Sequence, residues 1–418
     1  MKKRILIVLL FVVVKVGAQT SAFSAIDSLS DNGRYHLALK KLKAIKDQSF
    51  LSNYKTAVIY ESIDNYKETA NYLEKALKFK EDKKASLKLA KAYQKLSKSN
   101  QSIAIYEKLL AKDSLNLILE YQLGKLYLQY RKSKKAISLF KDLIEKDSTN
   151  AHYAYQLGLA YAYIKDRDRM INSFIETYKK DSLHVKSISK LALSFFKLRE
   201  KDSTYLFINK GLAVAPNHIN INKVKVNQLY REKKFKEIVS VLLKLDSIKP
   251  MDLFTNTMLG KVYYNLEDFE NAKLRFENSA ELDATNYKTY TYLGHIGMKK
   301  EDFTKAMFNY YRATTIGKEK RDEEYYGLAS AYYKMKRPKM ALRFYEKAFE
   351  ENRKNYNAKF QVAKITDDLY KDKKMAYKQY KSYNDRFANI DKVESEYVQK
   401  RISEIKKDYF MRGEKLEE

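Results

Sequence analysis

Small and apolar residues recur along the chain with a period of 34 residues. One register position carries a glycine or a small apolar residue in six successive segments: Gly124, Gly158, Ala192, Val226, Gly260 and Gly294. Most of these residues follow a leucine, and alanines and aromatic residues recur twelve and sixteen positions later, as at Ala136 and Phe140. Several independent marks that keep a period of 34 residues predict a repeated helix–turn–helix unit.

The same register extends over most of the chain. It continues upstream through Ala90 and Ala57, and downstream through Ala329 and Ala363 after a slip of one residue. About eleven units fit between residues 19 and 389, which we take as one repeat domain. A single helix pair cannot bury its own apolar stripe, so these units are expected to stack on their neighbours.

Short polar segments separate the repeats. The sequence "KDS" occurs three times, 34 residues apart, and its serines Ser114, Ser148 and Ser182 can accept backbone N–H groups at helix starts or turns. Pro338 follows a turn and suits the first turn of a helix.

The repeat pattern ends near Ile390. Residues 390–418 contain one amphipathic segment, whose apolar positions lie at near-helical intervals. These positions are Ile390, Val393, Tyr397, Ile402, Ile405 and Tyr409. We expect a helix that covers the exposed apolar edge of the last repeat, followed by a short tail. A helix that docks a partner is the alternative.

The first eighteen residues have the form of a secretory signal peptide. Three basic residues precede the apolar run 5–14, and Val16 and Ala18 are small enough for a cleavage site before Gln19. A membrane anchor is the alternative, but ten apolar residues are too short for a hydrocarbon core of about 30 Å. Residues 1–18 therefore predict an exported protein, periplasmic or secreted, with no transmembrane segment in the mature chain.

Composition narrows the possible chemistry. The chain has no cysteine, which excludes disulfides, thiolate metal sites and a thiol nucleophile. Only 11 glycines and 3 prolines occur in 418 residues, as long helices with short connections require. The formal net charge is +30, and removal of the four cations within residues 1–18 leaves +26. Such a chain attracts acidic proteins, anionic polymers or anionic lipid.

No arrangement of residues indicates catalysis. The five histidines are scattered, and no phosphate-binding glycine-rich loop or metalloprotease motif occurs. The acidic pairs Glu323–Glu324 and Asp367–Asp368 are adjacent, so their carboxylates point to different sides of a helix, and we interpret both pairs as solvated surface. We expect no enzyme, no cofactor and no metal site.

The segment "YQLGKLYLQYRKSKKAISLFKDLIEKDSTN" (121–150) resembles the tetratricopeptide repeat family. The resemblance implies an all-α solenoid, a right-handed superhelix of about eleven antiparallel helix pairs (helices A and B), here closed by a C-terminal capping helix. The chain departs from the family in having no tryptophan. The end of the signal segment and the "KDS" turns resemble exported repeat proteins of the Bacteroidetes group.

The family's inner groove supplies a candidate binding site. Five positions of each helix A face inward in the family, and here they form a basic and aromatic strip: Tyr155, Tyr163, Lys186, Lys223, Asn227, Tyr230, Arg231, Phe254, Lys261, Tyr264, Asn265, Lys288 and Tyr333. Some family members bind a C-terminal carboxylate with a Lys–Asn clamp. Lys223, Asn227 and Lys288 match that clamp, whereas Met258 and Tyr292 depart from it.

These features predict a non-catalytic scaffold that binds an acidic or extended peptide in this groove. The alternative is a structural envelope protein whose basic outer surface binds anionic polymer or lipid. Nucleic acid is not an expected partner, because the groove positions vary without a base-reading code. The sequence specifies neither the partner nor the oligomeric state.

Overall fold

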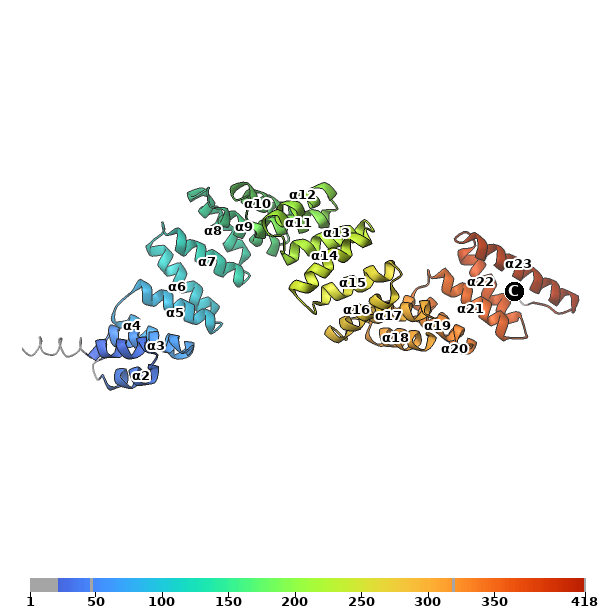
Figure 1. The fold of residues 1–418 in the computed structure, drawn as a ribbon, viewed down its shortest axis with the longest axis horizontal. Coiled ribbons are helices and arrows are strands. Elements are labelled where there is room, and N and C mark those ends of the chain that lie inside the picture. The colour runs from blue at the N-terminus through green and yellow to red at the C-terminus, as the bar shows by residue number, and fades with distance from the viewer. Residues whose placement is uncertain (1–21, 46–47, 318–319, 417–418) are drawn as a thin grey trace, which may run out of the picture. The chain divides into compact units, whose positions relative to one another are not determined.

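A computed structural model describes residues 22–45, 48–317 and 320–416. All regular secondary structure in these ranges is α-helical (Figure 1). The proposed signal peptide, residues 1–18, lies outside the described residues. By compactness the chain divides into two units, Met1–Leu198 and Arg199–Glu418. This division falls inside the segment 19–389 that the sequence suggested as one domain.

The first unit contains residues 22–31, which are helical, and helices α2 to α11. Their bounds are α2 Tyr35–Ala44, α3 Phe50–Ser62, α4 Tyr66–Phe79, α5 Lys83–Lys95, α6 Ser99–Lys112, α7 Leu117–Gln129, α8 Ser133–Lys146, α9 Ala151–Tyr163, α10 Arg167–Lys180 and α11 Val185–Leu198.

The second unit contains helices α12 to α23. Their bounds are α12 Lys201–Val214, α13 Ile219–Arg231, α14 Phe235–Ile248, α15 Leu253–Asn265, α16 Phe269–Leu282, α17 Tyr287–Lys299, α18 Phe303–Ile316, α19 Asp322–Lys334, α20 Pro338–Glu351, α21 Tyr356–Leu369, α22 Lys374–Phe387 and α23 Lys392–Met411.

Helices of 10 to 14 residues alternate with short turns until α23, which has 20 residues. In sequence order, the described helices make eleven pairs, the first being residues 22–31 with α2 and the last α21 with α22. Within each unit, a helix packs mainly against the helices that precede and follow it. The all-α solenoid and the number of repeats predicted from the sequence are confirmed.

The register glycines leave space for an aromatic ring of the same helix pair. A Cβ atom at Gly158 would lie 2.6 Å from the ring of Phe174, and one at Gly124 would lie 2.8 Å from the ring of Phe140. The ring of Tyr310 fits between two such positions, because a Cβ at Gly294 or at Gly327 would lie 2.7 or 2.5 Å from it. Real Cβ contacts are longer, so any side chain here would force the two helices apart.

Where the register residue is larger, the residue sixteen positions later is smaller. Val226 is paired in this way with Leu242, and both side chains are fully buried. The register residue and the residue sixteen positions later looked like independent marks in the sequence. Their sizes vary together because the two side chains share one volume between helices A and B.

The turns between helices A and B share a left-handed residue. Its φ lies between 55° and 64° at Asp64, Ser97, Arg131, Lys165, Arg199, Lys233, Glu267, Glu301 and Lys336, each seven positions after a register residue. At the third of these, the N–H of Arg131 donates to Leu128 O (3.0 Å) and that of Lys132 donates to Tyr127 O (2.8 Å). This Schellman arrangement satisfies the last carbonyls of helix A.

The "KDS" serines are not the residues that cap helix A. The caps of α7, α9 and α11 come two residues later, where Asn116, Asn150 and His184 accept the N–H groups of Leu119, His152 and Ser187. The prediction from the serines is wrong, because an Asx or imidazole acceptor sits closer to the helix start. Pro338 does occupy the first turn of α20, as expected.

Helix α23 covers the last helix pair. Val398, Ile405 and Tyr409 are buried against α22, and Ile402 packs beside them. Ile390 and Val393, which we expected on this face, are 57% and 78% exposed. Ile390 precedes the N-cap of the helix, and Val393 is five residues from Val398, which places it on another side of α23.

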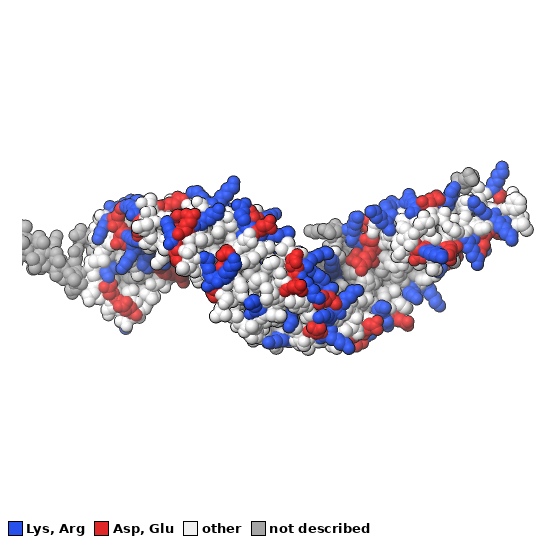
Figure 2. Space-filling model, turned by 90° about the horizontal axis from the view of Figure 1, so that it is seen from above, with Lys and Arg blue, Asp and Glu red and all other residues white. Residues whose placement is uncertain are grey.

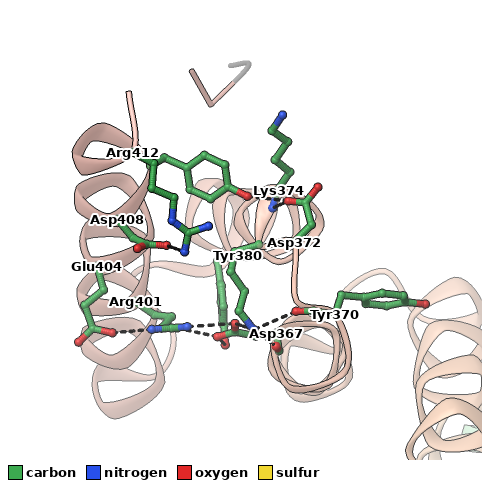
Figure 3. Close-up of polar contacts among 11 residues, drawn as sticks. Asp367, Tyr370, Asp372, Lys374, Tyr380, Arg401, Glu404, Asp408 and Arg412 are labelled. Carbon is green, nitrogen blue, oxygen red and sulfur yellow. Dashed lines mark hydrogen bonds and ion pairs between the residues drawn. The ribbon is translucent and has the colours of Figure 1, made fainter. Parts of the chain in front are cut away.

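A buried carboxylate fixes this C-terminal packing (Figure 3). Both carboxylate oxygens of Asp367 accept from Arg401 of α23, at 2.6 Å from Nε and 3.1 Å from the second guanidinium nitrogen. Lys373 Nζ lies 3.2 Å from the same group, and Tyr380 donates to it at 3.3 Å. Burial raises the pKa of Asp367, but the hydrogen bonds from Arg401 and Lys373 outweigh it and leave the pKa lowered.

The two acidic pairs are not wholly solvated, so that prediction is wrong. Asp367 and Glu324 are 5% and 3% exposed, and Glu324 accepts from the Thr291 hydroxyl at 2.8 Å. The geometric premise was right, because adjacent residues do point to different sides of a helix. That geometry makes one member of each pair face the neighbouring helix.

Candidate partner-binding strip

The predicted groove positions lie on the odd-numbered helices and form two sets, one in each unit. Tyr155 and Tyr163 of α9 and Lys186 of α11 belong to the first unit. The other ten residues belong to α13, α15, α17 and α19 of the second unit, and we call those ten positions the second-unit strip.

An aromatic cluster forms the centre of the second-unit strip. The ring of Tyr264 lies 5.5 Å from that of Tyr292 in a T-shaped contact and 6.3 Å from that of His295. Tyr292 in turn stacks on Phe276, with centroids 4.8 Å apart. Burial first, and then the neighbouring phenol of Tyr230, raise the pKa of Tyr292 to about 12. Tyr230 and Tyr264 therefore both lie close to Tyr292, a residue that the sequence analysis noted only as a departure from the carboxylate clamp.

Lys261 lies beside this cluster with its charge uncompensated. Its ammonium is 5.9 Å from the centre of the Tyr292 ring, and in the described part of the chain no carboxylate lies within ion-pair distance. Burial lowers the pKa of Lys261, and repulsion by Lys288 lowers it further. Both effects come from a cation that is half-buried without an anion.

Lys223 is not available in the way that a carboxylate clamp requires. Its ammonium lies 3.1 Å from Asp252, the N-cap residue of α15, and 4.8 Å from the centre of the Phe254 ring. Burial opposes ionisation of Asp252, but hydrogen bonds from Lys249 and Lys223 hold its pKa at about 2. The expected cation is therefore paired inside the protein, and the acid responsible was not recognised in the sequence.

A hollow of about 520 Å³ continues the strip between α17, α19 and α21. His295 stands at its edge, with Nδ1 2.7 Å from the Tyr310 hydroxyl and Nε2 3.1 Å from Glu323. Asp322 and two asparagines also line it. This end of the strip is polar and partly acidic, so the basic character expected from the sequence holds only near Lys261 and Lys288.

The remaining positions of the second-unit strip lie at its margins. Asn227 is half-buried, whereas Arg231, Asn265, Lys288 and Tyr333 are exposed. The amide of Asn265 donates to the Lys261 carbonyl at 2.7 Å. Within the clamp-like set, Lys223 is paired with Asp252, whereas among the described residues no carboxylate lies within ion-pair distance of Lys288.

In the first unit, Tyr155 and Tyr163 have different surroundings. Tyr155 is half-buried, 4.8 Å from the ring of His184 and 5.7 Å from that of Phe174. Tyr163 is 57% exposed and lies next to the turn between α7 and α8. Lys186 is exposed on α11.

The described residues contain no group of three or more side chains suited to a metal ion. Within the same residues, none of the helices is both long and apolar enough to cross a bilayer.

Comparison with known families explains the period. Models of the tetratricopeptide repeat match residues 87–151, 255–286 and 325–355. These three segments are tetratricopeptide repeats. The fold is an all-α solenoid of tetratricopeptide-repeat type, in which the helix pairs between the matched segments keep the same register. No family of enzymes is among the matches.

The chain is similar to several solved structures at low sequence identity. One is the Cut9–Hcn1 hetero-tetramer of the APC/C, at 13% identity over 91% of this chain and 89% of that chain, with a TM-score of 0.43. Another is yeast Tom70, at 14% identity over 94% and 96%, with a TM-score of 0.38. A third is the C-terminal part of a repeat protein from Cytophaga hutchinsonii, at 20% identity over 65% and 99%, with a TM-score of 0.42. Likeness of this degree carries no information about the partner.

Proposed function

We propose that this protein is a non-catalytic scaffold of the bacterial envelope that binds an extended protein segment along the second-unit strip. Tetratricopeptide-repeat proteins generally mediate protein–protein interactions. The envelope location rests on residues 1–18, whose basic start, apolar run and small final residues have the form of a signal peptide.

The observation that carries the proposal is Lys261, which has no carboxylate partner among the described residues and lies beside the half-buried rings of Tyr264 and Tyr292. A half-buried cation without a counter-charge gains more from an incoming carboxylate than an exposed lysine does, because its pKa has already been lowered by burial and repulsion. Tyr264 and Tyr292 offer apolar and hydrogen-bonding surface next to it, and tyrosine is a common energetic centre of protein interfaces. The partner therefore presents an acidic residue to Lys261 and Lys288 and an apolar residue to the two tyrosines.

The acidic character of the partner is confined to this part of the strip. Lys223 is neutralised by Asp252, and Glu323 faces the hollow next to His295. A segment that is acidic throughout would meet Glu323 and Asp322 at the far end. A short acidic stretch followed by polar residues suits the strip better.

The test is capture from an envelope extract at low and moderate salt, with the chain from Gln19 as bait. Bound proteins are identified by mass spectrometry, and synthetic segments of them are then titrated by fluorescence anisotropy. We expect Lys261→Met and Tyr264→Ala each to weaken the segment by about tenfold or more. Lys244→Met is the matched control, because Lys244 is an exposed lysine of α14 in the same unit.

Equal capture by the wild-type protein, Lys261→Met and Tyr264→Ala would contradict the proposal. Loss of binding in Lys244→Met to the same degree would show that only net charge matters, and would also contradict it.

A further inference from the structure

The turn between α7 and α8, together with the start of α8, gathers four cations around a hollow. Arg131, Lys132, Lys134 and Lys135, here called the basic turn, line a depression of about 760 Å³ together with Ser133 and two residues at the end of α9. Those two residues are Tyr163 and Ile164. The hollow contains no carboxylate, whereas acidic residues line each of the other hollows described around Tyr290, Leu89, Asp367 and His295.

Most of this charge has no internal partner. Lys135 lies 3.0 Å from Glu107, and Lys132 donates to the Asn100 amide oxygen at 3.1 Å. Among the described residues, no carboxylate lies within ion-pair distance of Arg131, Lys132 or Lys134. In the described part of the chain, three of these four cations are therefore left without an internal counter-charge.

Apolar side chains protrude beside these cations. Tyr163, the last residue of α9, is 57% exposed, and Ile164, the C-cap residue that follows it, is 43% exposed. Lys165 and Arg167 follow them, while Asp166 is occupied in capping α10 and pairing with Arg169. An amphipathic tip of this kind, with a tyrosine and an aliphatic residue between cations, has the composition found at membrane interfaces.

A turn of the second unit has the same kind of charge but not the same surroundings. Lys233, Lys234 and Lys236 lie in the turn between α13 and α14 and at the start of α14, where Glu232 and Glu237 are each within 3.7 Å of Lys234. On the face drawn in Figure 2, lysine and arginine are likewise interspersed with aspartate and glutamate. The basic turn is thus a local excess of positive charge, because elsewhere, on the face drawn, the basic residues are interspersed with acidic ones.

We propose that the basic turn, with Tyr163 and Ile164, binds the surface of an anionic lipid bilayer. Among the described residues, Arg131, Lys132 and Lys134 have no carboxylate partner, and unpaired cations of this kind suit a surface of many mobile phosphates better than one fixed carboxylate. The basic turn attracts the headgroups, while the tyrosine ring and the isoleucine enter the interfacial region. This role goes beyond the proposed scaffold function and uses a different part of the molecule.

The test is sedimentation of the full chain from Gln19 with vesicles. Vesicles of phosphatidylcholine containing about one third phosphatidylglycerol are compared with vesicles of phosphatidylcholine alone. We expect binding only to the anionic vesicles, reduced by about thirtyfold or more in Lys132→Glu/Lys134→Glu, since each cation near such a surface contributes about a factor of five. The variant Tyr163→Ser/Ile164→Ser keeps the charge and is expected to reduce binding by about tenfold.

The matched control is Lys233→Glu/Lys236→Glu, which changes the net charge by the same amount in the other turn. It is expected to bind nearly as well as the wild-type protein, and circular dichroism confirms that each variant is folded. Equal losses in both charge variants would overturn the proposal, as would absence of binding to anionic vesicles. Binding to heparin but not to vesicles would instead indicate a soluble polyanion, and would also overturn it. Loss of the Lys261-dependent partner leaves this test unchanged, so the two proposals fail separately.

Discussion

From α5 to α10 and from α13 to α20 the helix pairs are held by a small residue facing a ring or a branched side chain, whereas at α21–α23 they are held by tyrosines and one buried carboxylate. Gly158 with Phe174 represents the first arrangement, and Asp367 with Arg401 represents the second. The turns differ as well. The turns of the inner repeats contain a left-handed residue, but the α21–α22 turn has Tyr370 at φ −109° and is secured by Lys373, which donates to the carbonyls of Asp367 and Tyr370.

The difference follows from position in the array. An inner helix pair has a neighbour on each side, so the same apolar contact can be repeated with compensating changes of volume. The last described pair, α21 with α22, packs against α23, which is longer than the helices of the repeats. Directional hydrogen bonds to Asp367 specify one position of α23, which apolar contacts alone do not.

The largest effect is expected from filling the space at a register glycine. Gly158→Val places a branched side chain where even a Cβ atom would lie 2.6 Å from Phe174, and should lower the free energy of unfolding by about 3 kcal/mol. Adding Phe174→Leu reproduces the pair of residues found naturally at Val226 and Leu242. This second substitution should therefore restore most of the lost free energy of unfolding. Denaturant unfolding of the single and double variants measures both effects. Additive losses in the double variant would refute the volume rule.

A slightly smaller and local effect is expected at the C-terminal end. Arg401→Ala leaves Asp367 buried with Lys373 as its remaining cation, and should cost about 2 to 3 kcal/mol. Because neighbouring repeats contribute most of the stability of each part, α23 should open while α5–α20 stay folded. Hydrogen exchange by mass spectrometry locates the change. Uniform loss of protection along the chain would show that the two regions are not separable.

A buried acid of an inner repeat, Glu120, is expected to give the stability of the protein the opposite pH dependence to that given by Asp367. Glu120 of α7 is 1% exposed, and one of its oxygens has no hydrogen-bond partner although Lys146 lies 2.9 Å from the other. Burial, and then Asp142, raise the pKa of Glu120 from 4.5 to about 7. Between these values the folded state keeps a proton that the unfolded state has lost, so stability falls as pH rises, by up to about 1.4 kcal/mol per pH unit.

Asp367 has a lowered pKa, so its contribution is instead lost as pH falls through that pKa. Chemical denaturation at pH 5, 6 and 7 compares the wild-type protein with Glu120→Gln, which should remove the fall between about pH 4.5 and 7. An unchanged slope in the variant would mean that Glu120 is ionised in the folded protein throughout this range.

The smallest effect is expected at a left-handed turn residue. Glu267 has φ 60°, a conformation that costs a residue with a Cβ about 1 kcal/mol and a β-branched residue more. Glu267→Gly should therefore be neutral or slightly stabilising, whereas Glu267→Val should lose about 1 kcal/mol. The matched substitutions at Tyr370, whose φ is negative, should show the reverse order, so that Tyr370→Gly is less stable than Tyr370→Val. Thermal unfolding of the four variants decides the point.

The fold was predictable because its signal is repeated. Each register residue is weak evidence alone, but Gly124, Gly158, Gly260 and Gly294 keep one spacing, and the number of helix pairs follows from it. The left-handed turns were not predictable from composition, since polar side chains rather than glycines occupy them.

The details of the strip were harder to predict because they depend on contacts between repeats. Nothing in the sequence near Lys223 indicates that Asp252, 29 residues away, pairs with it. Tyr292 was discounted because it departs from a clamp, although its position next to Tyr264 and Lys261 follows from the same register. Comparing inward positions across adjacent repeats, rather than along one helix, would have revealed both.

The left-handed turn residues have one further consequence. The Schellman hydrogen bonds set the backbone at these residues, and their side chains point into solvent. Each repeat therefore has one position at which the choice of side chain has little effect on the stability of the fold. This position is occupied by arginine or lysine at 131 and 165 and by glutamate at 267 and 301. Along one edge of each unit, the chain can therefore acquire or reverse charge one repeat at a time, and a new surface can evolve without repacking the helices beneath it.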